Sequence, residues 1–175
     1  MTIRSRIVAG MDDAPTAPQV YRIFIRASAE QVWQGITDPA FIARYFHGSH
    51  VRNELRAGGR WLSMSPDGQE VWNDGQVLEC DPPRRLVQTW RMAMDPQAAA
   101  EGFTRLTYEI TEGGGAGVCR LTVIHEVGTA PTVAAMVEGA PGAEQQLGGG
   151  GWPWILSDLK TLLETGSSFT SPAAR

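Results

Sequence analysis

A chain of 175 residues, of which 42% are hydrophobic and 19% are charged, has the length and composition of one globular domain with a sizeable core. The formal net charge of −4 gives no general attraction to nucleic acid or to an anionic membrane surface, and no apolar run approaches the roughly 20 residues that span a bilayer. The two cysteines, Cys80 and Cys119, lack the spacing of a metal site, so we expect reduced thiols in a cytoplasmic protein.

The chain is expected to begin with a tail and a strand. Residues 1–18 lack periodicity and are rich in Ala, Pro, Asp and Thr, which predicts a mobile N-terminal tail, and they have no long apolar core of the signal-peptide kind. Between residues 19 and 27, Arg22 and Arg26 alternate with apolar side chains. This period of two predicts a strand with one buried face.

Two short helices are predicted directly after this strand. Ser28 and Gln31 form a capping-box pattern that starts the first helix. That helix ends before Asp38-Pro39, where Asp38 has the position of an N-cap and Pro39 that of the first helical residue. The second helix therefore runs through residues 41–46.

Six further strands are predicted between residues 50 and 127. They cover residues 50–56, 60–65, 69–80, 85–94, 103–112 and 118–127. The connections are rich in Gly, Pro and Asp and most are short, with a longer loop at 95–102. Parallel neighbours need long crossovers, so the pattern predicts an antiparallel meander.

A glycine run at 148–151 follows a segment without strand pattern, in which one short helix is predicted at 131–138. A phosphate-binding loop needs a Lys-Ser or Lys-Thr pair directly after its glycines, and this chain has none there. The remaining interpretations are a hinge and a slack connector, either of which leaves the angle of the next helix free.

A final helix is predicted from residue 152 to about 164, with Gly166 as its C-cap. Its apolar residues form one stripe at helical spacing: Trp152, Ile155, Leu156, Leu159, Leu162 and Leu163. A helix of this length is not stable alone, so we expect the stripe to cover the sheet and to leave space for a ligand. The sequence thus predicts one domain at 19–166 and a disordered C-terminal tail at 167–175.

Taken in order, these segments resemble a known superfamily. The matching motifs are SAEQVW at 28–33, TDP at 37–39, GGRW at 58–61, GQVLECDPPRRL at 75–86, TW at 89–90, LTVIH at 121–125 and GW at 151–152. They resemble the START-like, or SRPBCC, helix-grip superfamily, and within it the group related to the C-terminal domain of the activator of heat-shock-protein-90 ATPase. The resemblance implies an α+β fold, in which a curved antiparallel sheet has two short helices after the first strand and a long C-terminal helix across its concave face.

The resemblance also implies a range of functions. Members bind apolar small molecules, and a few act as cyclases or hydrolases. The eukaryotic relative acts on a chaperone through an additional N-terminal domain, for which this chain has no room. This argues against a chaperone partner, which we keep only as a secondary alternative.

His125 is the candidate for chemistry. Strand alternation places it on the same face as Leu121 and Val123, and Glu126 on the opposite face, so His125 faces the core or a cavity. It is either a core histidine satisfied by a neighbour, or a ligand contact or general base. His47 and His50 lack a third metal ligand, and we interpret them as surface histidines.

Gln88 interrupts the apolar side of a predicted strand between Leu86 and Trp90. A polar side chain on that side needs a partner, which is a ligand, a water or His125. The candidate ligand-binding residues are Trp61, Gln88, Trp90, Tyr108, His125, Trp152, Ile155 and Leu159.

The sequence thus predicts a protein that binds a small apolar or aromatic molecule without cofactor or metal, as a monomer or homodimer, and without a nucleic-acid or membrane partner. An enzyme is not expected, because no Ser-His-Asp order, activated cysteine or inward carboxylate pair can be assembled. The alternatives are a cyclase- or hydrolase-like enzyme with His125 as base, and a chaperone- or protein-interaction module whose core is filled by side chains.

Overall fold

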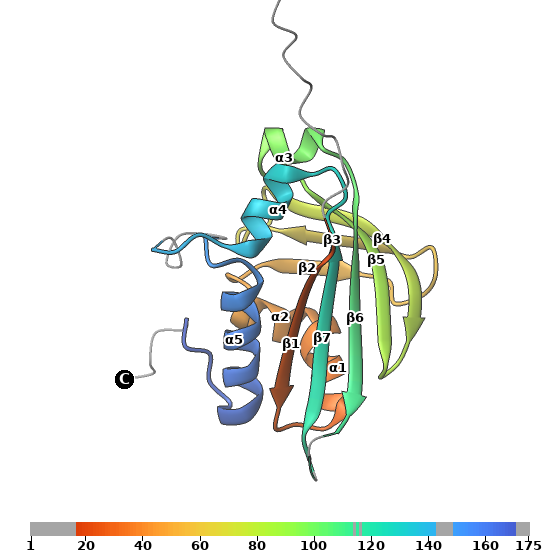
Figure 1. The fold of residues 1–175 in the computed structure, drawn as a ribbon, viewed down its shortest axis with the longest axis vertical. Coiled ribbons are helices and arrows are strands. Elements are labelled where there is room, and N and C mark those ends of the chain that lie inside the picture. Colours follow the sequence, from red (N-terminus) through yellow and green to blue (C-terminus); the bar gives the residue numbers. More distant parts are fainter. Residues whose placement is uncertain (1–16, 114, 116, 143–148, 171–175) are drawn as a thin grey trace, which may run out of the picture.

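The structure is a computed structural model that describes residues 17–113, 115, 117–142 and 149–170. Its centre is one antiparallel seven-stranded sheet with the strand order β1-β7-β6-β5-β4-β3-β2 (Figure 1). The strands are β1 (Gln19–Ile25), β2 (His50–Asn53), β3 (Arg60–Met64), β4 (Val71–Asp81), β5 (Arg85–Met92), β6 (Thr104–Glu112) and β7 (Cys119–Glu126). Strands β2 to β6 each pair with the next strand in sequence, which confirms the meander, and β1 pairs with β7.

The two helices after β1 begin where their caps predict. Helix α1 (Ala29–Thr37) has the complete capping box: the Gln31 backbone N–H donates to Ser28 Oγ at 3.2 Å, and the Ser28 N–H donates to Gln31 Oε1 at 2.9 Å. Helix α2 (Pro39–Tyr45) is capped by the Asp38 carboxylate, which accepts from two backbone N–H groups. The polar caps therefore fix the residues at which both helices begin.

Three more helices complete the described chain: α3 (Pro96–Ala100), α4 (Pro131–Glu138) and α5 (Gly151–Thr165). The sequence predicted α4 and α5, but residues 95–102 were expected to form a loop. That expectation is wrong for α3, because Asp95 caps it by accepting from the Ala98 N–H at 2.8 Å. No helix among the described residues is long and apolar enough to cross a membrane.

The glycine run is not slack. Gly151 has φ +55°, and a Cβ on it would lie 2.4 Å from the carbonyl oxygen of Val137 at the end of α4. A Cβ on Gly139 would lie 2.6 Å from the carbonyl carbon of Gly150. Glycines therefore let the backbones at the end of α4 and the start of α5 touch, which sets the position of α5 instead of leaving its angle free. The first glycine of the run lies outside the described residues.

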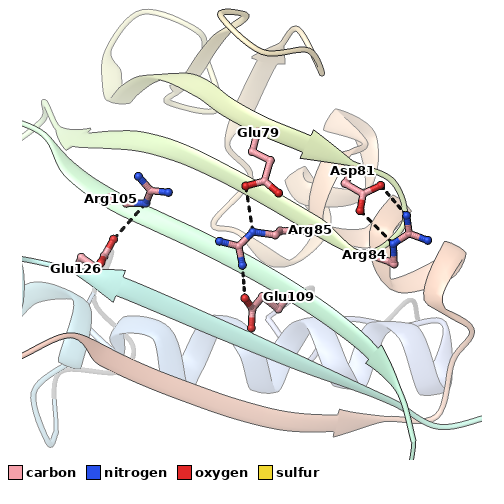
Figure 2. Close-up of polar contacts among 7 residues, drawn as sticks. All are labelled: Glu79, Asp81, Arg84, Arg85, Arg105, Glu109 and Glu126. Carbon is pink, nitrogen blue, oxygen red and sulfur yellow. Dashed lines mark hydrogen bonds and ion pairs between the residues drawn. The ribbon is translucent and has the colours of Figure 1, made fainter.

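The outer face of the sheet carries several ion pairs (Figure 2). Arg85 lies between Glu79 and Glu109 and pairs with both, and Arg105 pairs with Glu126 at 3.2 Å. The side chains of these pairs are 34–48% exposed, and exposed ion pairs contribute about 0–1 kcal/mol each to stability. Helices α1 and α5 lie on the opposite side of the sheet (Figure 2), so the core and any buried site lie there.

The residues that follow α5 fold back onto the middle of the helix. Asp158 is completely buried and accepts hydrogen bonds from Ser168 Oγ at 2.7 Å, the Phe169 N–H at 2.8 Å and Thr170 Oγ1 at 2.6 Å. Residues 168–170, which belong to the C-terminal tail expected from residue 167 onward, thus bond to a carboxylate of α5. Residues 1–16 of the expected N-terminal tail and residues 171–175 lie outside the described part of the chain.

Candidate functional site

Two adjoining cavities lie between the sheet and α5. The outer cavity, of about 70 Å³, is lined by Phe46, His47, Trp72, Asn73, Trp90, Met92, Met94, Met136, Val137, Gly151, Trp152 and Ile155. The inner cavity, of about 30 Å³, is lined by Ile36, Ile42, Tyr45, Phe46, Ser49, Val51, Trp61, Ser63, Asn73, Gln88, Trp90, Tyr108 and Trp152. Four side chains are common to both walls, so the inner cavity continues the outer one toward the sheet.

The outer cavity is mainly apolar and deformable. Met92 and Met94 come from the end of β5 and the residues after it, and Met136 comes from α4. Methionine side chains are flexible, and their sulfur atoms make favourable contacts with aromatic rings. His47 is also in this wall, and burial lowers its pKa against the opposing effect of the Asp158 charge. A wall of this kind suits an apolar or aromatic group.

The inner cavity contains polar groups without partners. Ser49, Ser63 and Gln88 are at most 3% exposed. Ser49 Oγ, Ser63 Oγ and Gln88 Oε1 make no hydrogen bond to any described part of the chain. A buried polar atom without a partner costs about 1–3 kcal/mol, and such atoms are uncommon in native structures. The inner cavity is therefore where the structure leaves hydrogen-bonding capacity unused.

His125 has protein partners at both ring nitrogens. The indole N–H of Trp152 donates to Nδ1 at 3.1 Å, and Nε2 lies 2.8 Å from Thr104 Oγ1. Because an indole N–H can only donate, Nδ1 must accept, and the proton of the neutral ring lies on Nε2. Thr104 Oγ1 in turn donates to the carbonyl oxygen of Trp90 at 2.9 Å. Burial lowers the pKa of His125 to about 4, so the ring is neutral at pH 7.

Six of the eight candidate ligand-binding residues line the cavities: Trp61, Gln88, Trp90, Tyr108, Trp152 and Ile155. The other two lie elsewhere in the core. His125 is in neither wall and is not the partner of Gln88, because Leu106 stands between them in the strand register. Leu159 packs on α1, where its Cδ1 would lie 3.1 Å from a Cβ on Gly35.

Sequence reasoning missed Ser49, Ser63 and Asn73. Ser63 shares the alternation of β3 with Trp61, so a signal for it was present. Ser49 follows α2 in a turn without periodicity, where no pattern predicts its direction. A register shift after Ser63 in the pairing of β3 with β4 leaves the adjacent Trp72 and Asn73 both buried, which breaks the alternation that the sequence argument used.

The site has no metal-binding character in the described ranges, where no three His, Cys, Asp or Glu side chains group together. Nor does either cavity wall contain Arg, Lys, Asp or Glu. The chemistry available is therefore apolar contact at the outer end and neutral hydrogen bonding at the inner end.

Several solved structures have a similar fold. The solution structure of CalU16 from Micromonospora echinospora is 22% identical over 89% of this chain and 69% of its own, with a TM-score of 0.62. DynU16, from the dynemicin biosynthetic locus, is 25% identical over 88% of this chain, with a TM-score of 0.60. An HSP90 activator from Plasmodium falciparum is 17% identical over 62% of this chain and 71% of its own, with a TM-score of 0.52.

The chain spans 64% of the CalU16 crystal chain and about half, 49%, of DynU16. Among curated proteins there is no significant match. A family model matches residues 26–164, which run from the end of β1 to the last turn of α5 and include every residue of both cavity walls. The chain therefore belongs to the family of the Activator of Hsp90 ATPase homolog 1-like proteins, and it has that family's helix-grip fold.

Proposed function

We propose that this protein binds a small apolar or aromatic molecule in the outer cavity. The observation that carries the proposal is the composition of the wall, where three methionines surround Trp90 and Trp152 without any charged side chain of the Arg, Lys, Asp or Glu kind. Concave apolar sites with a few convergent polar groups are the usual form of small-molecule sites. DynU16 comes from a biosynthetic locus, which supports the inclusion of biosynthetic intermediates among the compounds tested.

The volume of the outer cavity sets the size of the ligand. At about 70 Å³ it is smaller than the roughly 300–1,000 Å³ of drug-sized pockets. A molecule larger than one ring therefore requires the side chains of Met92, Met94 and Met136 to move. Their unbranched, flexible side chains make such movement less costly than it is for branched residues.

The second candidate is a protein-interaction module with a filled core, which the small volumes of both cavities favour. Catalysis by His125 finds no support in the geometry, because its Nδ1 lone pair accepts from Trp152 and is not directed at either cavity. A base needs a free lone pair within reach of the substrate proton.

A thermal-shift screen tests the proposal. The compounds are flavonoids, fatty acids, sterols and aromatic polyketides. A ligand at about one hundred times its Kd adds about 2.7 kcal/mol and raises Tm by roughly 2–4 °C. We expect a dose-dependent shift that is lost in Met136→Trp, which fills the outer cavity, and kept in Met136→Leu, which preserves its volume. No shift from any class would contradict the proposal and favour the interaction module.

A further inference from the structure

We infer that the inner cavity is a recognition site for a neutral hydroxyl group, carried by a ligand whose apolar body lies in the outer cavity. The inference rests on the proposed function, because it needs the outer cavity to hold that body. It starts from Ser49 Oγ, Ser63 Oγ and Gln88 Oε1, which are buried, line the same cavity and have no partner in the described chain.

The donors and acceptors of these three side chains match a hydroxyl group. A serine hydroxyl both donates and accepts, and a glutamine amide offers a carbonyl acceptor and an NH₂ donor. A ligand hydroxyl also does both, so it can donate to Gln88 Oε1 while it accepts from Ser49 or Ser63. A methyl group of the same size would leave all three atoms unpaired, which is the more costly state.

The charge of the site excludes ionised groups. The inner wall contains no Arg or Lys to neutralise a carboxylate and no Asp or Glu to neutralise an ammonium. The pKa of Tyr45, which lines the inner cavity, is raised by burial, by Tyr108 and by the charge of Asp158, in that order. The same negative charge of Asp158 would repel an anion in the inner cavity. A buried charge without a partner is strongly unfavourable.

The dimensions place the hydroxyl and not the ring in the inner cavity. Its volume of about 30 Å³ exceeds the roughly 10–15 Å³ that one water needs but is too small for an aromatic ring. Phe46, Asn73, Trp90 and Trp152 line both cavities, so a ring held in the outer cavity directs its hydroxyl into the inner one. A phenol or a compact aryl alcohol has this shape.

The test is an NMR titration of the full chain with phenol, toluene and benzoate, which differ in the group that would enter the inner cavity. We expect phenol to bind at least about tenfold more tightly than toluene, and benzoate to bind most weakly. In Gln88→Met, which keeps the length of the side chain and removes the amide, the preference for phenol over toluene should fall to about one. Gln34→Met makes the same change on the exposed face of α1 and should keep the preference.

The outcomes separate this inference from the proposed function. If toluene binds and phenol has no advantage, two waters satisfy the inner cavity and only the hydroxyl inference fails. If benzoate binds most tightly, the inner cavity is an anion site and the inference is likewise overturned. If no compound binds the wild type, both fail. The amide spectrum of Gln88→Met shows that the variant is folded, and Ser63→Ala, a smaller change, should reduce the phenol preference in the same direction.

Discussion

His125 joins the sheet to α5 through its neutral form. Trp152 on α5 donates to one ring nitrogen, and the other donates to Thr104 on β6. Protonation would place a second proton on Nδ1, where the indole N–H already points, and would bury a charge. Burial therefore lowers the pKa of His125 from 6.5 to about 4.

This shift predicts a loss of stability in mild acid. Between pH 6.5 and about 4, the unfolded chain binds a proton at His125 and the folded protein does not. The free energy of unfolding is therefore highest above pH 6.5 with respect to this group, and it falls as the pH drops toward 4. The contribution of His125 to that loss is about 3 kcal/mol. Urea unfolding at a series of pH values measures it.

The control is His125→Leu, which should be less stable by about 1–3 kcal/mol at pH 7 because Trp152 loses its acceptor, but should show a flatter pH profile. His47, whose pKa burial also lowers, acts in the same direction, so the difference between the two profiles isolates His125. An unchanged slope in His125→Leu would contradict the assignment.

For single residues, strand alternation predicted which side chains point inward, but it did not predict their hydrogen-bond partners. Gln88 and His125 both face the helix side of the sheet, as expected from their strands. Trp152 and Thr104 provide the partners of His125, whereas Gln88 Oε1 has no partner in the described chain. Both outcomes depend on contacts between residues far apart in the chain. Periodicity contains no information on such contacts.

At the scale of elements, the crossing of α4 and α5 depends on glycine. Gly151→Ala should cost about 1–3 kcal/mol for the positive φ and a further 1–3 kcal/mol for the contact with the Val137 carbonyl. Gly128 has the same φ of +55° with no atom within 4 Å of a Cβ, so Gly128→Ala should show only the first loss. Thermal unfolding of both variants gives the difference. Equal losses would mean that the close approach is not important for stability.

Helix α4, which supplies Met136 to the outer cavity, lacks a side-chain cap of its own and is held by Glu101. This carboxylate accepts from the Thr132 and Val133 N–H groups at 2.8 and 3.0 Å. Burial raises the pKa of Glu101, but these hydrogen bonds outweigh it and the net pKa is lowered. The carboxylate therefore acts as a cap from a distant part of the chain.

Removal of this cap should loosen α4. Glu101→Ala is expected to speed hydrogen exchange of the α4 amides about fivefold, which corresponds to about 1 kcal/mol, the typical loss of a cap. Glu138→Ala, at the other end of the same helix, should leave the exchange of its first turn unchanged. Exchange rates that respond equally to both variants would argue against a specific cap.

At the scale of the molecule, turn chemistry was sufficient to predict the meander of β2 to β7, and the caps at Ser28 and Asp38 were sufficient to predict the starts of α1 and α2, because these depend on local signals. The pairing of β1 with β7 and the presence of α3 were not predicted. Cavity size did not follow from the sequence. It depends on how closely α5 approaches the sheet, and the start of α5 is constrained by the contact of Gly151 with Val137 of α4, which no sequence pattern indicates. From the sequence alone, a glycine run predicts a flexible backbone. Only the residues that lie next to it in the fold show that its glycines permit a close contact between two backbones.

The position of α5 in the chain order has a consequence for biosynthesis. Helix α5 follows all seven strands, so the apolar side of the sheet is made before the helix that covers it. At roughly 5–20 residues per second, the ribosome adds the residues from the end of β7 to the end of α5 over several seconds. Until α5 packs on the sheet, the side chains of the sheet that later form the cavity walls lack this cover. Any factor that binds the nascent chain would therefore meet the side of the sheet that α5 covers in the finished fold.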